Sequence, residues 1–251
     1  MRRWQSAAFL IFIFCLTSGF AQQRNVAKLS AVPFVGCKSD GQVGPLDAPS
    51  AGEVVEADAG IAGKLAYYKA ENGPGVLAPR GWYCVGTYGS AGAHVFVTPQ
   101  PVRPESLLSA NAKSFTGPAI QADSMSGGTS GRFAVAQTVA RVFPAHLEFA
   151  RQVIQEGLFP ASDFPMGPYP KDQLTYKSDH VVEFRTPPHT DGLGTASYLQ
   201  ANDHWIDGVA ILGGPETYLM QLTVRMPADL HAIELPIVEQ FEKEWVDRPD
   251  H

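Results

Sequence analysis

The sequence predicts an α+β fold, in which an antiparallel sheet built from hairpins is packed against helices. Short apolar or alternating segments occur in pairs that are separated by glycine-rich turns, a pattern typical of hairpins. Helical patterns stand in blocks between these pairs, whereas a parallel sheet needs strands and helices that alternate. The 24 glycines and 20 prolines among the 251 residues also indicate a large share of loops and turns.

The first elements expected in the chain are one strand and one helix. The apolar run 31–37 is followed by turn-forming residues and is typical of a strand. Ile61, Leu65 and Tyr68 repeat at helical spacing, and Asp58 stands where it could cap the helix. We therefore expect one helix that carries all three apolar residues.

A hairpin is expected next. Segments 81–87 and 93–98 have the composition of strands and are joined by the turn-rich residues 89–92. The proline-containing segment 99–114 shows no period and predicts a surface crossing. We expect residues 22–251 to form a single α+β domain, and 99–114 marks the boundary if that domain has two lobes.

The middle of the chain is predicted to hold a strand and two helices. The strand is expected at 118–125, before a glycine-rich turn. Apolar residues from Phe133 to Phe143 repeat at helical spacing, and Pro144 ends this helix because the residue before a proline disfavours the helical region. A second apolar stripe predicts another helix over 147–158.

The last third of the chain is predicted to hold strands and a terminal helix. The segment 173–186 shows apolar and polar residues in alternation, as in a strand with one wet face. The apolar run 208–212 and the alternating run 218–225 flank a glycine-proline turn and predict a second hairpin. The terminal helix is expected to begin near Pro236 and to bury one side as far as Trp245.

Residues 1–21 have the three parts of a cleavable secretory signal peptide. Arg2 and Arg3 precede an apolar stretch at 7–16, and small residues precede a cleavage point after Ala21. The apolar stretch is shorter than the roughly 20 residues that a spanning helix needs, and no later segment approaches that length. We therefore expect a periplasmic or secreted protein that does not span a membrane after its leader is removed.

Export determines how the cysteines are interpreted. Removal of Cys15 with the leader leaves Cys37 and Cys84, an even pair in an oxidising compartment where disulfides persist. We expect a disulfide between them. Two buried free thiols are the alternative, because free cysteine often serves as a small apolar residue.

Charge and motifs exclude several classes of function. The formal net charge is -6, and the 19 Lys and Arg residues are scattered singly, which argues against nucleic-acid binding. The run 192–194 has the spacing of a dinucleotide fingerprint, but Ser197 stands where its third glycine belongs, and no other cofactor motif occurs. The sequence therefore predicts no cofactor, and it does not identify a partner.

Four titratable residues lie close together in a loop-rich segment. His189, Asp191, His204 and Asp207 could converge as an acid–base pair or as metal ligands. Their spacing matches no metal-binding motif, and histidines in loops are usually solvated. The sequence therefore predicts no metal site.

The glycine-rich turn 126–132 is the segment that most suggests a ligand. It stands between a strand and a helix, where free backbone N–H groups and the charge of Arg132 could hold an anion. In this interpretation Thr129, Ser130 and Arg132 bind a carboxylate or phosphate. The alternative is structural, in which Thr129 or Ser130 only caps the helix.

Three segments resemble a family of exported bacterial proteins of unknown function. They are GVLAPRGWYC at 75–84, GGTSGRF at 127–133 and VFPA at 142–145. The resemblance covers most of the chain after the leader and implies export and one shared fold. It implies no activity, cofactor or catalytic residue.

Two hypotheses of function stay open. The first is a non-catalytic secreted or envelope-associated protein that binds a partner or a cell-surface component, because no nucleophile–base or metal signature occurs. The second is a hydrolase of an envelope ester, peptide or glycan, with Ser130 as nucleophile and His94 or His189 as base. The hydrolase requires an imidazole within hydrogen-bond reach of Ser130.

Overall fold

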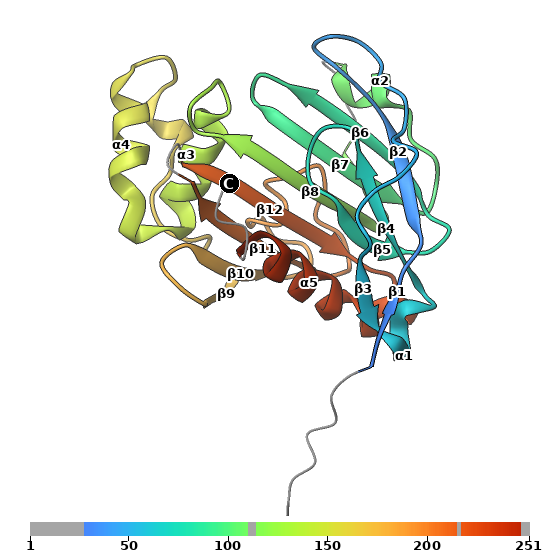
Figure 1. Cartoon of the computed structure of the whole chain (residues 1–251). Coiled ribbons are helices and arrows are strands. Elements are labelled where there is room, and N and C mark those ends of the chain that lie inside the picture. The colour runs from blue at the N-terminus through green and yellow to red at the C-terminus, as the bar shows by residue number, and fades with distance from the viewer. Residues whose placement is uncertain (1–27, 110–113, 215–216, 247–251) are drawn as a thin grey trace, which may run out of the picture.

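The computed structural model describes residues 28–109, 114–214 and 217–246, and within them the fold is α+β. One large sheet is mostly antiparallel, and helices pack on it (Figure 1). Its strands, in spatial order, are β5 (Val76–Pro79), β4 (Leu65–Ala70), β2 (Phe34–Gly41), β6 (Tyr83–Gly89), β7 (Gly92–Thr98), β8 (Ala119–Ser126), β12 (Tyr218–Arg225), β11 (Ile206–Gly213), β10 (Val181–Thr186) and β9 (Gln173–Tyr176). The predicted signal peptide lies outside the described residues.

Smaller elements complete the described part of the chain. A separate two-stranded sheet pairs β1 (Leu29–Ala31) with β3 (Glu56–Asp58). The helices are α1 (Ala59–Ala62), α2 (Pro104–Leu108), α3 (Arg132–Val142), α4 (Leu147–Gln155) and α5 (Glu234–Val246), with short 3-10 helices η1 (Pro144–His146), η2 (Ala161–Asp163) and η3 (Ala228–Ile233). No helix among these residues is long and apolar enough to cross a membrane.

Strand β2 departs from the antiparallel arrangement that we expected. It runs parallel to β4 on one side and to β6 on the other. Consecutive strands β6 and β7 pair antiparallel, and so do β11 and β12. A strand pattern shows which residues face the same side, but it does not identify the neighbouring strand, so the position of β2 between β4 and β6 could not be predicted.

The helix expected through Ile61, Leu65 and Tyr68 is wrong in most of its length. Asp58 does cap a helix, since its carboxylate accepts a 2.7 Å hydrogen bond from the Gly60 N–H, but α1 ends at Ala62 and β4 begins at Leu65. Strand β4 is buried on both faces. A strand buried on both faces shows no alternation, so its apolar residues can match a helical period by chance.

Other boundaries differ from the prediction by smaller amounts. The strand expected at 31–37 lies at Phe34–Gly41. The segment 173–186 contains two antiparallel strands, β9 and β10, rather than one. The chain reverses between them, and the His180 N–H donates to Ser178 Oγ at 3.1 Å in this turn. The predicted surface crossing at 99–114 contains α2 and connects β7 to its neighbour β8.

Different helices cover the two faces of the sheet. Ala210 packs in the apolar cluster that contains α3 and α4, whereas the next residue of β11, Ile211, packs in the cluster that contains α5. Because successive residues of a strand point to opposite faces, α3 and α4 lie on one side of the sheet and α5 on the other. Figure 1 shows α3 and α4 grouped at one end and α5 across the sheet.

The predicted disulfide between Cys37 and Cys84 is confirmed. It connects the neighbouring parallel strands β2 and β6, whose register pairs Lys38 with Val85 one residue further along. The two cysteines are 47 residues apart in the sequence. The disulfide therefore closes a long loop and connects the N-terminal strand to the middle of the sheet.

Candidate functional site

Ser130, the proposed nucleophile, has another serine as its partner. Its Oγ lies 2.9 Å from Ser90 Oγ, and the contact is exposed. Among the residues that the structure describes, no histidine hydrogen bonds to Ser130. The structure therefore does not bring Ser130 together with His94 or His189.

Arg132 and Thr129, proposed to hold an anion with Ser130, are engaged within the protein. The Arg132 guanidinium binds the Glu156 carboxylate, with Nη2 2.7 Å from Oε2, and this hydrogen bond raises the pKa of Arg132. Thr129 Oγ1 accepts a 3.3 Å hydrogen bond from the Gly131 N–H. Glu156 thus neutralises the positive charge that an anion would need here.

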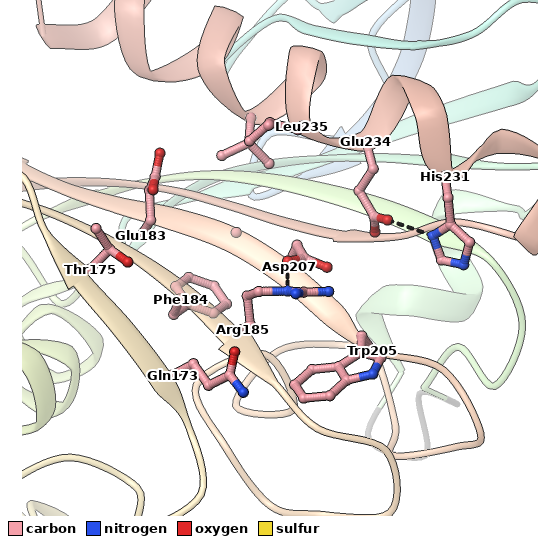
Figure 2. A pocket seen from close by; sticks show the side chains of 12 residues that line it. Gln173, Thr175, Glu183, Phe184, Arg185, Trp205, Asp207, His231, Glu234 and Leu235 are labelled. Carbon is pink, nitrogen blue, oxygen red and sulfur yellow. Dashed lines mark hydrogen bonds and ion pairs between the residues drawn. The ribbon is translucent and has the colours of Figure 1, made fainter.

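His189 and Asp207 lie in different surroundings. His189 Nε2 contacts Asp203 Oδ1 at 2.7 Å, and both side chains are exposed. Asp207 faces a cavity under α5, where its Oδ1 lies 2.5 Å from Arg185 Nε (Figure 2). Within the described ranges, no three His, Cys, Asp or Glu side chains are placed to hold a metal ion.

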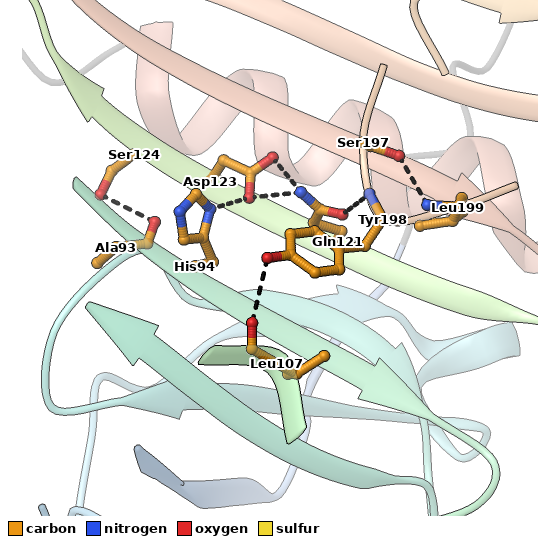
Figure 3. Close-up of polar contacts among 9 residues, drawn as sticks. All are labelled: Ala93, His94, Leu107, Gln121, Asp123, Ser124, Ser197, Tyr198 and Leu199. Carbon is orange, nitrogen blue, oxygen red and sulfur yellow. Dashed lines mark hydrogen bonds and ion pairs between the residues drawn. The ribbon is translucent and has the colours of Figure 1, made fainter. Parts of the chain in front are cut away.

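His94 is the sequence-predicted candidate that the structure places in a buried polar network. It lies on β7 directly opposite Asp123 of β8. His94 Nδ1 is 2.6 Å from Asp123 Oδ1, and Asp123 is only 2% exposed (Figure 3). A buried carboxylate is costly unless it is paired and hydrogen-bonded, so His94 and Asp123 depend on each other.

Gln121 completes the hydrogen bonding of Asp123. Its Nε2 donates to both carboxylate oxygens of Asp123 at 2.9 Å. Its Oε1 accepts a 2.8 Å hydrogen bond from the Tyr198 N–H, and the Tyr198 hydroxyl donates to Leu107 O at 3.3 Å (Figure 3). This network connects the sheet to the loop that carries Tyr198 and fixes the position of the Asp123 carboxylate.

Gln221 extends the polar row to a third strand. It lies on β12 opposite Asp123, so His94, Asp123 and Gln221 form one cross-strand row on the face that α3 covers. Gln221 is 3% exposed, and its side-chain amide forms no hydrogen bond with the described residues. A buried amide normally has partners, so this group is expected to bind water or a ligand.

These side chains form the floor of a cavity of about 420 Å³, which we call the His94 pocket. Helix α3 contributes Arg141 to one wall, and the loop with Ser197 and Tyr198 forms another. The volume is within the range of about 300–1,000 Å³ that is typical of small-molecule sites. Polar groups on the floor of a cavity of this size are the arrangement expected of a binding site.

The surroundings of His94 in the pocket raise its pKa. Burial disfavours the imidazolium, but the hydrogen bond to Asp123 and the Asp123 charge outweigh it, so the pKa of His94 is raised. With Nδ1 held by Asp123, His94 Nε2 donates to the pocket when the ring is protonated and accepts when it is neutral. The other cation, Arg141, stacks 4.0 Å from the centre of the Tyr169 ring and forms no ion pair with a described carboxylate.

Asp123, Gln121 and Gln221 are not among the site residues predicted from the sequence. One signal was present, because Gln121 and Asp123 alternate with apolar residues in the predicted strand 118–125. In a strand with one wet face such residues point to solvent. Here α3 and the loop around Tyr198 cover that face, and neither cover could be inferred from the strand itself.

No family model, curated protein or solved structure matches this chain.

Proposed function

We propose that this chain is an exported, non-catalytic protein, periplasmic or secreted, that binds a small organic anion in the His94 pocket. The observation that carries the proposal is the Gln221 amide, which lines the pocket beside the His94–Asp123 pair and has no hydrogen-bond partner among the described residues. A ligand would form hydrogen bonds with the Gln221 amide in place of water.

An anion fits the charges of the pocket. Asp123 is already compensated by His94 and by the Gln121 amide, whereas Arg141 forms no hydrogen-bonded ion pair with a described carboxylate and acts on Asp172 only at longer range. Asp163 also contributes to the lining but is an exposed residue. The carboxylate of a ligand would accept hydrogen bonds from Arg141 and from protonated His94. Other polar groups of the ligand would contact Gln221.

Calorimetric titration of the oxidised protein with succinate, citrate and benzoate tests this proposal. We expect saturable binding of at least one carboxylate, weakened about tenfold or more by Arg141→Gln and by Gln221→Leu. The matched control is Arg151→Gln, which changes an exposed arginine of α4 and should leave binding unchanged. Absence of saturable binding, or equal binding by Arg141→Gln, would refute the anion site.

Export rests on separate support. The Cys37–Cys84 disulfide is of the kind that persists in oxidising compartments, and the resemblance of 75–84 and 127–133 to exported proteins agrees with it. Intact-mass measurement on protein from its native host should find an N-terminus at Gln22 and two cysteines that alkylate only after reduction. Retention of Met1 in the isolated protein would contradict export by cleavage.

Acid–base catalysis is a second candidate, favoured by the orientation of His94. Asp123 holds Nδ1, so the neutral ring presents its Nε2 lone pair to the pocket, as a general base requires.

Hydrolysis of chromogenic esters distinguishes the two candidate functions. Loss of activity in His94→Gln but not in Ser130→Ala would assign the base to His94, the reverse would support Ser130, and inactive wild-type protein would favour binding alone.

A further inference from the structure

Glu234 places a buried carboxylate at the start of α5. Its side chain is only 7% exposed, and Oε2 lies 2.8 Å from His231 Nδ1. The second oxygen, Oε1, is buried without a hydrogen-bond partner among the described residues. An unpartnered carboxylate oxygen is costly in a protein interior, so a group that donates to it would stabilise this arrangement.

The Glu234 carboxylate faces a second cavity, which we call the Glu234 pocket. Its volume is about 570 Å³, and it lies between α5 and the sheet face opposite the His94 pocket. Figure 2 shows Glu234 pointing from the helix toward Asp207 and Arg185 on the strands below. Leu235 and Val238 of α5 give part of the wall an apolar character.

The charges of this pocket leave one carboxylate without a permanent counter-ion. Lys177 Nζ lies 3.0 Å from Glu183, and Arg185 Nε lies 2.5 Å from Asp207, so both of these acids are paired. The side-chain partner of Glu234 is His231, whose side chain is 44% exposed and is charged only when protonated, and the Met226 backbone also hydrogen-bonds to the Glu234 carboxylate. Glu183 and Asp207 therefore have a Lys or Arg partner, whereas Glu234 has no such ion pair among the described residues.

The shifts in the pKa values of Glu234 and Asp207 agree with a shortage of positive charge in this pocket. Burial raises the pKa of Glu234, and the nearby Asp207 carboxylate raises it further, whereas the hydrogen bond to His231 lowers it. Burial likewise raises the pKa of Asp207, and Arg185 opposes that shift. Both acids are therefore in a position where an additional cation would favour their ionised forms.

The lining of the pocket contains a cation–π contact of the protein itself. The Arg185 guanidinium lies 4.8 Å from the centre of the Trp205 ring, at the distance of a cation–π contact. Trp205, Asp207 and Glu234 thus combine an aromatic surface with carboxylates in one cavity (Figure 2). This combination suits an ammonium group attached to a small apolar body.

We propose that the Glu234 pocket is a second ligand site, which binds a small organic amine through its ammonium group. The ammonium donates to the Glu234 carboxylate and supplies it with a permanent counter-ion. The apolar body of the amine lies along Leu235 and Val238. This site is separate from the His94 pocket and has the opposite preference for charge.

An NMR titration of the oxidised full chain with n-butylamine tests the proposal, with n-butanol, butyrate and glucose as ligands of matched size or polarity. We expect n-butylamine alone to shift the Trp205 indole N–H signal in a saturable way, with the signal assigned from Trp205→Phe. Glu234→Gln should weaken n-butylamine binding about tenfold or more, because the ammonium loses a charge-assisted hydrogen bond. The matched control, Glu239→Gln, alters an exposed acid of the same helix and should leave binding unchanged.

Equal binding of n-butylamine by Glu234→Gln, or binding of n-butanol or glucose as strong as that of the amine, overturns the proposal. Absence of any saturable shift at millimolar amine overturns it as well, and the pocket then holds water alone.

A second variant covers the case in which Glu234→Gln does not fold. Leu235 is 58% exposed, so Leu235→Lys should fold and, by placing a tethered ammonium at the pocket, compete with n-butylamine, whereas Leu235→Met should not.

Discussion

Arg225 donates hydrogen bonds to the backbone carbonyl of Gly117, from Nε at 2.9 Å and from Nη2 at 2.5 Å. The same guanidinium also donates to the carbonyl oxygens of Phe115 and Gln200. Arg225 has no exposed surface, and burial lowers its pKa to about 10. Backbone carbonyl groups thus hold the buried guanidinium of Arg225, which fixes two segments beside the loop that carries Tyr198.

We expect Arg225→Met to lower the free energy of unfolding by about 2–5 kcal/mol, because three backbone carbonyl groups lose the donor that the buried guanidinium supplies. Urea denaturation followed by circular dichroism measures this loss. Arg151→Met, at an exposed position, should change the free energy by less than about 0.5 kcal/mol. A loss below about 1 kcal/mol for Arg225→Met would mean that water replaces the guanidinium in this position.

The His94–Asp123 pair should make stability depend on pH. The pKa of His94 is raised above 6.5 in the folded protein, so its stabilising contribution is fully present below about pH 6.5 and is lost as the pH rises through the raised value. The difference in unfolding free energy between wild type and His94→Gln should therefore shrink across that interval. A difference that grows with pH would contradict the ion pair.

Asp123→Asn should reverse the shift of the His94 pKa. The charge of Asp123 would be lost while the burial remains, and burial alone lowers the pKa of a histidine. A titration of the His94 ring by NMR should give a pKa above 6.5 in wild type and below 6.5 in Asp123→Asn. The same value in both proteins would show that the carboxylate does not determine the protonation of His94.

Thr186 connects Asp172 to the loop of the His94 pocket. Its Oγ1 donates to Asp172 Oδ1 at 2.8 Å and accepts from the Gly194 N–H at 3.0 Å. We expect Thr186→Val to cost about 1–3 kcal/mol, since both partners remain buried or half-buried without it. Hydrogen exchange at Gly194 should accelerate in Thr186→Val but not in Thr186→Ser, which keeps the hydroxyl. Unchanged exchange in Thr186→Val would exclude this connection.

Loss of the Cys37–Cys84 disulfide should destabilise the protein by about 4 kcal/mol, because the bond closes a loop between residues 47 apart in sequence. The double variant Cys37→Ala, Cys84→Ala, compared with wild type in urea without reductant, measures the effect. Wild type treated with reductant should then unfold at the same urea concentration as the double variant. Equal stability of oxidised and reduced wild type would show that the bond does not limit unfolding.

Local patterns in the sequence identified several elements near their observed positions. Strands occur close to 93–98 and 218–225, and α3 and α5 begin within two residues of Phe133 and Pro236. Helices α3 and α5 each have one buried face, so their periodicity is visible in the residues themselves, and β12 alternates apolar and polar residues although both of its faces are buried. Strand β4 is buried on both faces, and for that reason its pattern suggested a helix.

The candidate site depended on contacts that local patterns do not encode. The sequence named His94, but its partner Asp123 lies 29 residues away and reaches it only through the register of β7 and β8. Gln121 and Asp123 alternate with apolar residues as in a strand with a solvent-exposed face, and it is the packing of α3 and the Tyr198 loop that makes this face the floor of a pocket.

The sequence by itself determined the α+β class and the cysteine pair, because composition and periodicity are properties of neighbouring residues. Tertiary structure alone decided the parallel position of β2, the two pockets and the partners of His94 and Glu234. Strand register and the covering of a sheet face come from long-range packing, in which residues far apart in the chain compete for the same contacts.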